Sequence, residues 1–123
     1  MESEVRSKTT PDFKLQTPNL SIMFIYNVTT KVAWPIHEAW VQWMREKHIP
    51  DVMNSGCFTE SRFVCLLETD ETEGPTYAVQ FYAVTKADYE RYIEQHAPEL
   101  RKDAMNNWGD NFISFRTLMQ LVN

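Results

Sequence analysis

The sequence is poor in glycine, with three glycines among 123 residues, and it contains neither a glycine-rich phosphate loop nor a GxGxxG pattern. Such loops let the backbone approach a phosphate group closely. The sequence also lacks the GxSxG pattern that positions a nucleophilic serine. Covalent, phosphoryl-transfer and dinucleotide chemistry therefore have no signature in this chain.

Cysteine and metal-binding motifs are equally scarce. Cys57 and Cys65 are the two cysteines, and on one strand they would lie roughly 26 Å apart, far beyond disulfide reach. We expect two free thiols, as is typical of a reducing compartment. His37 and Glu38 begin an HExxH pattern, but Val41 replaces its second histidine. No metal and no cofactor are expected.

Positive charge is in deficit. The formal net charge is −5, and no run of lysine and arginine occurs. Because phosphate contacts need clustered basic side chains, the chain is not expected to bind nucleic acid or anionic lipid. No apolar run approaches the roughly 20 residues of a membrane span. Without the apolar segment of a signal peptide, the expected location is the cytoplasm.

The composition is sufficient for one domain, with 43% hydrophobic and 13% aromatic residues. Residues 1–22 are polar, carry Pro11 and Pro18, and show neither a helical nor a strand period. They are predicted to form a flexible N-terminal extension. Residues 23–123 are predicted to form the domain.

Hydrophobic periodicity predicts four strands and two helices in that domain. Strands are expected at 23–30, 58–67, 76–84 and 112–122, and helices from Pro35 toward Gly56 and from a capping sequence at Thr85 to Gly109. The order βαββαβ is typical of the α+β ferredoxin-like sandwich, with an antiparallel four-stranded sheet.

A repeated motif supports two similar halves. EKHIPDV at 46–52 returns as EQHAPEL at 94–100, once in each predicted helix. The two helices of this fold run antiparallel, so His48 and His96 would point toward opposite ends of the sheet. The repeat is therefore better explained by the fold than by a two-histidine metal site.

The strand faces predict a homodimer. One set is almost wholly apolar and is expected beneath the helices, namely Phe24, Tyr26, Val28, Phe63, Cys65, Leu67, Tyr77, Val79, Phe81, Ile113, Phe115, Met119 and Leu121. The opposite face mixes polar and apolar residues, among them Asn27, Arg62, Val64, Gln80, Tyr82, Arg116 and Leu118. Such a face is too apolar for water and too charged for a monomer core. A second copy of the sheet would cover it, in a dimeric α/β barrel.

His48 and Asp51 form the candidate catalytic pair. They stand three residues apart on a helix, where a carboxylate can orient an imidazole as a general base. Alternatively the pair braces the distortion that Pro50 introduces. We expect the bracing role, with no cavity beside the imidazole of either His48 or His96.

Aromatic residues provide the candidate ligand site. Tyr26, Trp40 and Trp43, with His48, can wall a pocket between helices and sheet, although aromatic residues at this spacing also build cores. Arg62 and Arg116 can hold an anionic ligand in the barrel or form ion pairs between subunits.

Several motifs together resemble a known family. They are YNVT at 26–29, WVQWMREKHIPDVM at 40–53, TYAVQFY at 76–82, YERYIEQHAPELR at 89–101 and FRTLM at 115–119. Over residues 23–122 the chain resembles a bacterial family of uncharacterised domains, common in the Bacteroidetes, in the dimeric α/β-barrel superfamily. The resemblance implies a ferredoxin-like dimer and no particular reaction.

More distantly, the W-x₇-H-x-P spacing from Trp40 to Pro50 is similar to that of antibiotic-biosynthesis monooxygenase-like and stress-responsive α/β-barrel proteins. The expected function is binding of a small, partly apolar molecule between helices and sheet. One alternative is a cofactor-independent monooxygenase- or isomerase-like enzyme with His48 as its base. Another is a structural or interaction module without a ligand. The sequence does not decide between binder and enzyme.

Overall fold

The computed structural model describes residues 23–122, and the predicted extension at 1–22 lies outside this range. The elements follow the predicted order, with each helix divided into parts. They are β1 (Phe24–Val32), the 3-10 turn η1 (Trp34–Ile36), α1 (His37–Trp43), the π-helical segment η2 (Met44–His48), α2 (Ile49–Met53), β2 (Glu60–Cys65), β3 (Thr76–Ala83), α3 (Lys86–Gln95), α4 (Ala97–Trp108) and β4 (Phe112–Gln120).

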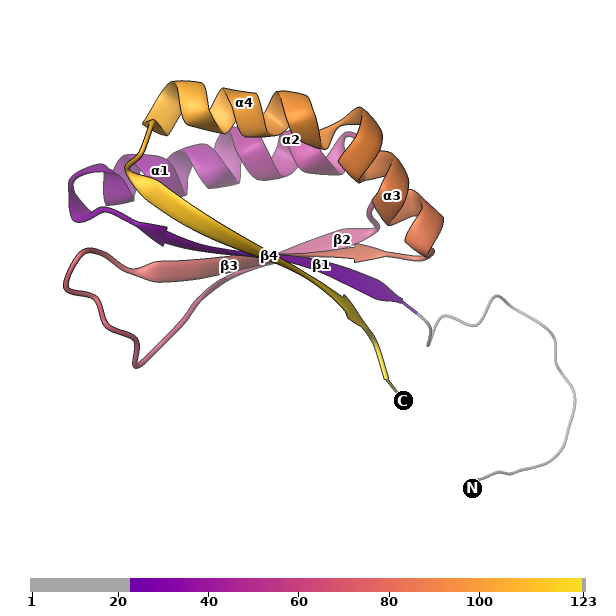
Figure 1. Ribbon diagram of the computed structural model, residues 1–123, viewed down its shortest axis with the longest axis horizontal. Helices are drawn as coiled ribbons and strands as arrows, with labels where there is room; N and C mark the ends of the chain where they lie inside the picture. Colours follow the sequence, from indigo (N-terminus) through magenta and orange to yellow (C-terminus); the bar gives the residue numbers. More distant parts are fainter. Residues whose placement is uncertain (1–22, 123) are drawn as a thin grey trace, which may run out of the picture.

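The four strands form one sheet in the order β2-β3-β1-β4, and every neighbouring pair is antiparallel. All the labelled helices lie on one side of the sheet (Figure 1). Within residues 23–122 no helix covers the other side, which we call the open face. The predicted α+β ferredoxin-like fold is confirmed.

The register of β4 corrects one prediction. Tyr26 pairs with Leu118, and Val28 pairs with Arg116. Paired residues of an antiparallel ladder point to the same side of the sheet, so Arg116 and Leu118 lie on the helix side. Their assignment to the dimer face was wrong. The same register moves three residues predicted beneath the helices to the open face, namely Ile113, Phe115 and Met119.

Alternation in a strand shows which residues share a face, and not which face the helices cover. In β4 the more apolar set lies on the open face. The other predicted dimer-face residues keep their side, because Asn27 and Arg62 both pair with Gln80, and Val64 pairs with Ala78.

The helical part of each half is interrupted at the repeated motif. In the first half the π-helical segment ends at His48, and Pro50 lies in the first turn of α2. In the second half His96 separates α3 from α4 with a non-helical φ of −123°, and Pro98 lies in the first turn of α4. Proline lacks the N–H that a helix interior requires and is tolerated in a first turn. The repeat therefore marks an irregularity in both halves, a π-helical turn with helical dihedrals in the first and a non-helical residue in the second.

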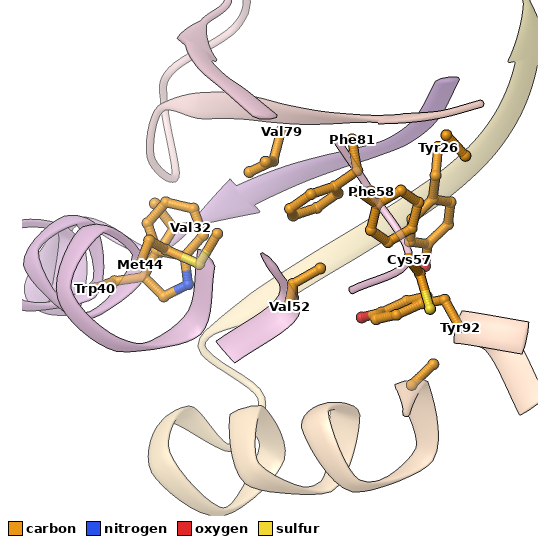
Figure 2. Close-up of a cluster of buried hydrophobic side chains, with 12 residues drawn as sticks. Tyr26, Val32, Trp40, Met44, Val52, Cys57, Phe58, Val79, Phe81 and Tyr92 are labelled. Carbon is orange, nitrogen blue, oxygen red and sulfur yellow. The ribbon is translucent and has the colours of Figure 1, made fainter. Parts of the chain in front are cut away.

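The core lies between the helices and the sheet. Figure 2 shows its buried side chains, including the aromatic group Tyr26, Phe58, Phe81 and Tyr92. The ring of Tyr26 lies 6.2 Å from Phe58 and from Phe81 and 5.7 Å from Tyr92, measured between centroids. Tyr26 therefore packs simultaneously against the helix layer and against its own sheet.

The two cysteines are free thiols, as predicted. Cys65 ends β2, but Cys57 precedes that strand and is buried in the core, so the two do not share one strand. Thr85 caps α3 as predicted, because its hydroxyl accepts a hydrogen bond from the N–H of Asp88 at 3.1 Å.

Candidate functional site

A cavity of about 320 Å³ lies between the helices and the helix side of the sheet. This volume is at the lower end of the range for small-molecule sites, which is about 300–1,000 Å³. Its lining residues are Tyr26, Val28, Thr30, Trp40, Trp43, Met44, His48, Val79, Phe81, Tyr92, Leu100, Arg101, Ala104, Met105, Phe112, Ile113, Ser114 and Arg116.

The structure brings together the four side chains that the sequence proposed for ligand binding. Tyr26, Trp40, Trp43 and His48 all line the cavity. Tyr26 comes from β1, the tryptophans from α1, and His48 from the end of the π-helical segment. Ligand binding by these four residues stays a prediction. The structure adds that all four border the same cavity.

The imidazole of His48 is positioned by the break in its helix. Pro50 has no N–H, so it cannot bond to the carbonyl of Glu46, and the helix widens where this bond is missing. The N–H of Ile49 instead bonds to the carbonyl of Met44, five residues earlier. Single turns of this kind occur frequently at functional sites.

Burial keeps the imidazole of His48 neutral. It lowers the pKa of His48 to about 4, although the carboxylates of Asp51 and Asp103 act in the opposite direction. The cations of Lys47 and Arg116 contribute further lowering. The Nδ1 atom of His48 is enclosed and has no hydrogen-bond partner in the described part of the chain. A neutral imidazole with an unused nitrogen therefore borders the cavity.

Asp51 does not hold this imidazole by a hydrogen bond. Its carboxylate accepts a hydrogen bond from Nζ of Lys47 at 2.7 Å. Nζ of Lys47 also lies 3.5 Å from the carboxylate of Asp103. This second ion pair connects the π-helical segment to α4. Asp51 therefore acts on His48 only through its charge, and neither predicted role of the pair has the expected hydrogen bond.

His48 and His96 differ although their motifs match. The ring of His96 stacks on Tyr92, with centroids 6.3 Å apart and planes inclined by 16°. His96 does not line the cavity, whereas His48 does. The expectation that neither imidazole borders a cavity was wrong for His48. The site thus breaks the internal symmetry of the fold.

Two further enclosed nitrogens lack hydrogen-bond partners among residues 23–122, and one of them belongs to Trp43, which lines the cavity. Trp43 and Trp108 pack edge to face with centroids 5.7 Å apart, and within residues 23–122 neither enclosed indole N–H has an acceptor. Buried polar groups are usually hydrogen-bonded, so each exception requires an explanation such as a water or a ligand. Thr30 and Ser114, in contrast, bond to each other at 2.8 Å.

The sequence did not identify Arg101 as a lining residue, and it placed Arg116 on the other face. Arg101 comes from α4 and Arg116 from β4, and both are exposed at the cavity. The guanidinium of Arg101 donates a hydrogen bond to the hydroxyl of Tyr26 at 3.2 Å. Arg101 directly follows Leu100, an apolar residue that also lines the cavity, and only the register of β4 could have revealed Arg116.

Other features of the described residues are outside this site. His37 bonds through Nε2 to the hydroxyl of Tyr77 at 2.6 Å, and neither residue lines the cavity. Among residues 23–122 no three His, Cys, Asp or Glu side chains are grouped as metal ligands. None of the helices described between these limits is both long and apolar enough to span a membrane.

Solved structures share this fold at low sequence identity. A dimeric ferredoxin-like protein from an uncultured marine organism aligns with a TM-score of 0.63 and 8% identity, covering 83% of this chain and 96% of that protein. An EthD-like protein from Ralstonia eutropha has a TM-score of 0.60 and 14% identity, with 82% and 93% covered. The hydroxynitrile lyase of Passiflora edulis has a TM-score of 0.55 and 12% identity, with 81% and 96% covered. These similarities show the fold alone.

No curated protein matches the chain significantly. The bacterial source that the motifs imply stays a prediction. The family comparison is more specific, since one family model, described as a domain of unknown function, matches residues 23–122. That match covers most of the chain and includes both H-x-P motifs and all four strands. The chain belongs to the DUF4286 family of domains of unknown function.

Proposed function

We propose that this protein binds a small, partly apolar molecule in the cavity beside His48. The observation that carries the proposal is a mostly apolar cavity bordered by His48 and Trp43, whose enclosed nitrogens have no hydrogen-bond partner among residues 23–122. Leaving one buried polar group unsatisfied costs about 1–3 kcal/mol. Both nitrogens have essentially no accessible surface, so this cost is retained beside the cavity, and a core packed for stability alone would have no reason to retain it.

The walls support a ligand that is mostly apolar. They include Met44, Val79, Phe81, Leu100 and Phe112. At about 30 Å³ for each water molecule, 320 Å³ is room for on the order of ten waters or a comparable number of ligand atoms. The cavity therefore fits a compact molecule of one ring or one short chain.

Catalysis by His48 is the second candidate, because the imidazole borders the cavity. An efficient general base has a pKa near the working pH. Burial instead lowers the pKa of His48 to about 4, and the carboxylate of Asp51 is bonded to Lys47. These two observations favour binding over base catalysis. The module without a ligand is disfavoured by the cavity itself.

We also propose that the open face forms a homodimer. In the isolated chain Val64 is 43% and Phe115 64% exposed, and both lie on this face. The corrected register of β4 makes the face more apolar than the sequence predicted, because Arg116 leaves it and Phe115 joins it. A self-complementary twofold contact would bury these side chains.

The binding proposal is tested by calorimetric titration with 3-phenylpropionate and its neutral amide, 3-phenylpropionamide. At least one of them is expected to bind the wild type. Ala104 lines the cavity, so Ala104→Phe should fill it and remove binding without unfolding the chain. Ala87→Phe on the exposed side of α3 is the matched control and should bind normally. Binding that survives Ala104→Phe, or binding of neither compound, contradicts the proposal.

A further inference from the structure

The charge around the cavity differs in sign from the charge of the protein. The chain carries a formal net charge of −5, yet no aspartate or glutamate is among the residues that line the cavity. Arg101 and Arg116 do line it, from opposite layers of the fold. The neutral imidazole of His48 adds no charge. The cavity is therefore a cationic site in an acidic domain.

Neither arginine is used in an ion pair within the described part of the chain. Lys47, Arg62, Lys86 and Arg91 all have carboxylate partners there. Arg101 and Arg116 have none, and the nearby Asp103 is bonded to Lys47. Arg101 is instead braced by the hydroxyl of Tyr26, a neutral acceptor that leaves its positive charge uncompensated.

We infer that the ligand of this cavity carries a carboxylate, which Arg101 and Arg116 hold at the cavity mouth. The inference rests on the proposed binding function and names the class of ligand. A guanidinium presents donors in a planar fork that matches the two oxygens of a carboxylate. Such charge-assisted bonds are about twice as strong as neutral ones. The apolar remainder of the molecule lies against the walls.

The position of the arginines supports this orientation. Arg101 and Arg116 are exposed, whereas Trp40, Met44 and Phe81 at the inner wall are buried. The charged group of a ligand can thus stay near water while its apolar part is enclosed. A singly charged carboxylate fits this setting better than a phosphate dianion, because a second charge near apolar walls is costly to desolvate. The ligand class is an amphipathic monocarboxylate, such as an aryl-alkanoic acid.

The test compares 3-phenylpropionate with 3-phenylpropionamide, which have nearly the same shape but differ in charge. The wild type should bind the acid about tenfold or more tightly than the amide, as expected for losing a charge-assisted bond. Arg101→Gln and Arg116→Gln should each weaken binding of the acid about tenfold and leave binding of the amide unchanged. Arg62→Gln is the matched control, because it removes one positive charge from the open face.

The outcomes distinguish the carboxylate assignment from the underlying binding proposal. Equal affinity of the wild type for acid and amide overturns the carboxylate assignment while the binding proposal stands, and this arm does not depend on how the variants fold. Binding of neither compound overturns both. An Arg62→Gln effect as large as that of Arg116→Gln also overturns the assignment, since only total charge would then matter. Tighter binding of phenyl phosphate than of 3-phenylpropionate would assign the site to phosphate esters instead.

Discussion

The imidazole of His48 stacks on the indole of Trp43, with ring centroids 4.9 Å apart and planes inclined by 25°. They stand five positions apart in the sequence, and in a regular α-helix such residues point about 140° away from each other. The π-helical segment from Met44 to His48 removes much of this divergence. The break at Pro50 thus brings together two cavity side chains that an unbroken helix would have separated.

The enclosed Nδ1 of His48 predicts that phenylalanine is tolerated at this position. His48→Phe keeps an aromatic ring on Trp43 and removes a buried nitrogen without a partner. Its free energy of unfolding, measured in urea at pH 7, should equal or exceed that of the wild type by up to about 1–2 kcal/mol. No nitrogen of His96 is both enclosed and without a partner in the described part of the chain, so His96→Phe should give no such gain. A marked loss at His48 would show that its nitrogen contributes to stability.

The lowered pKa of His48 predicts a dependence of stability on pH. In the unfolded chain its pKa is 6.5, and in the folded chain it is about 4. As pH falls below about 6.5 the unfolded state takes up a proton that the folded state refuses, so stability is lost until about pH 4. The stabilising contribution is fully present above about pH 6.5, and the total loss is roughly 3 kcal/mol.

The measurement is the difference in free energy of unfolding between the wild type and His48→Gln from about pH 7 to about pH 4. Other titrating groups remain in both proteins and largely cancel, although Asp51 and Asp103 interact with His48 and contribute a smaller term. The advantage of the wild type over the variant should decrease as pH falls. A difference that stays constant would show that the imidazole is not kept neutral by burial.

The open face predicts the effect of Phe115 on assembly. The wild type should sediment at about twice the chain mass of 14.5 kDa. Phe115→Asp places a charge at the proposed dimer contact and should give a folded monomer, because this side chain is 64% exposed within one chain. Val64→Asp should act in the same direction. Met105→Asp changes an apolar side chain of the helix layer that is 56% exposed, so it is the control and should remain dimeric. A wild-type monomer would contradict the proposal.

The backbone around Gly74 leaves no room for a side chain in the β2–β3 connection. A Cβ atom there would lie 1.7 Å from the carbonyl oxygen of Val32, in backbone that cannot move freely. The N–H of Val32 is bonded to the carbonyl of Pro75 at 3.0 Å, which holds the connection against β1. Gly74→Ala should therefore lower the free energy of unfolding by about 1–3 kcal/mol or more.

Gly56 supplies the comparison for Gly74, since a Cβ there would meet no atom within 4 Å. Its positive φ of 75° still makes alanine unfavourable, by about 1–2 kcal/mol. Urea unfolding of both alanine variants separates the two effects. A Gly74→Ala cost no larger than that of Gly56→Ala would show that the connection can move away from Val32.

Much of the fold is predictable because its signals are local. Hydrophobic periodicity and turn-forming residues predict four strands within a few residues of their observed ends. The helices of the second half begin after Thr85 and end before Gly109, as expected. The proline in each repeated motif also marks the position where the helical structure is interrupted, and it is visible in the sequence. Aromatic residues at helical spacing, together with Tyr26, suggested a pocket wall, and they line the observed cavity.

What the sequence by itself determined is the order of the elements and the sets of residues that share a face. Only the tertiary structure decided which face of β4 the helices cover, and with it the positions of Arg116 and Phe115. It also decided that Lys47, rather than His48, takes the carboxylate of Asp51. The physical reason is that alternation and helical period are properties of one segment, whereas burial, cavities and ion pairs arise between segments. Where either face of a strand could pack against the helices, hydrophobicity alone does not decide which face does so. The pairing register with the neighbouring strand decides it.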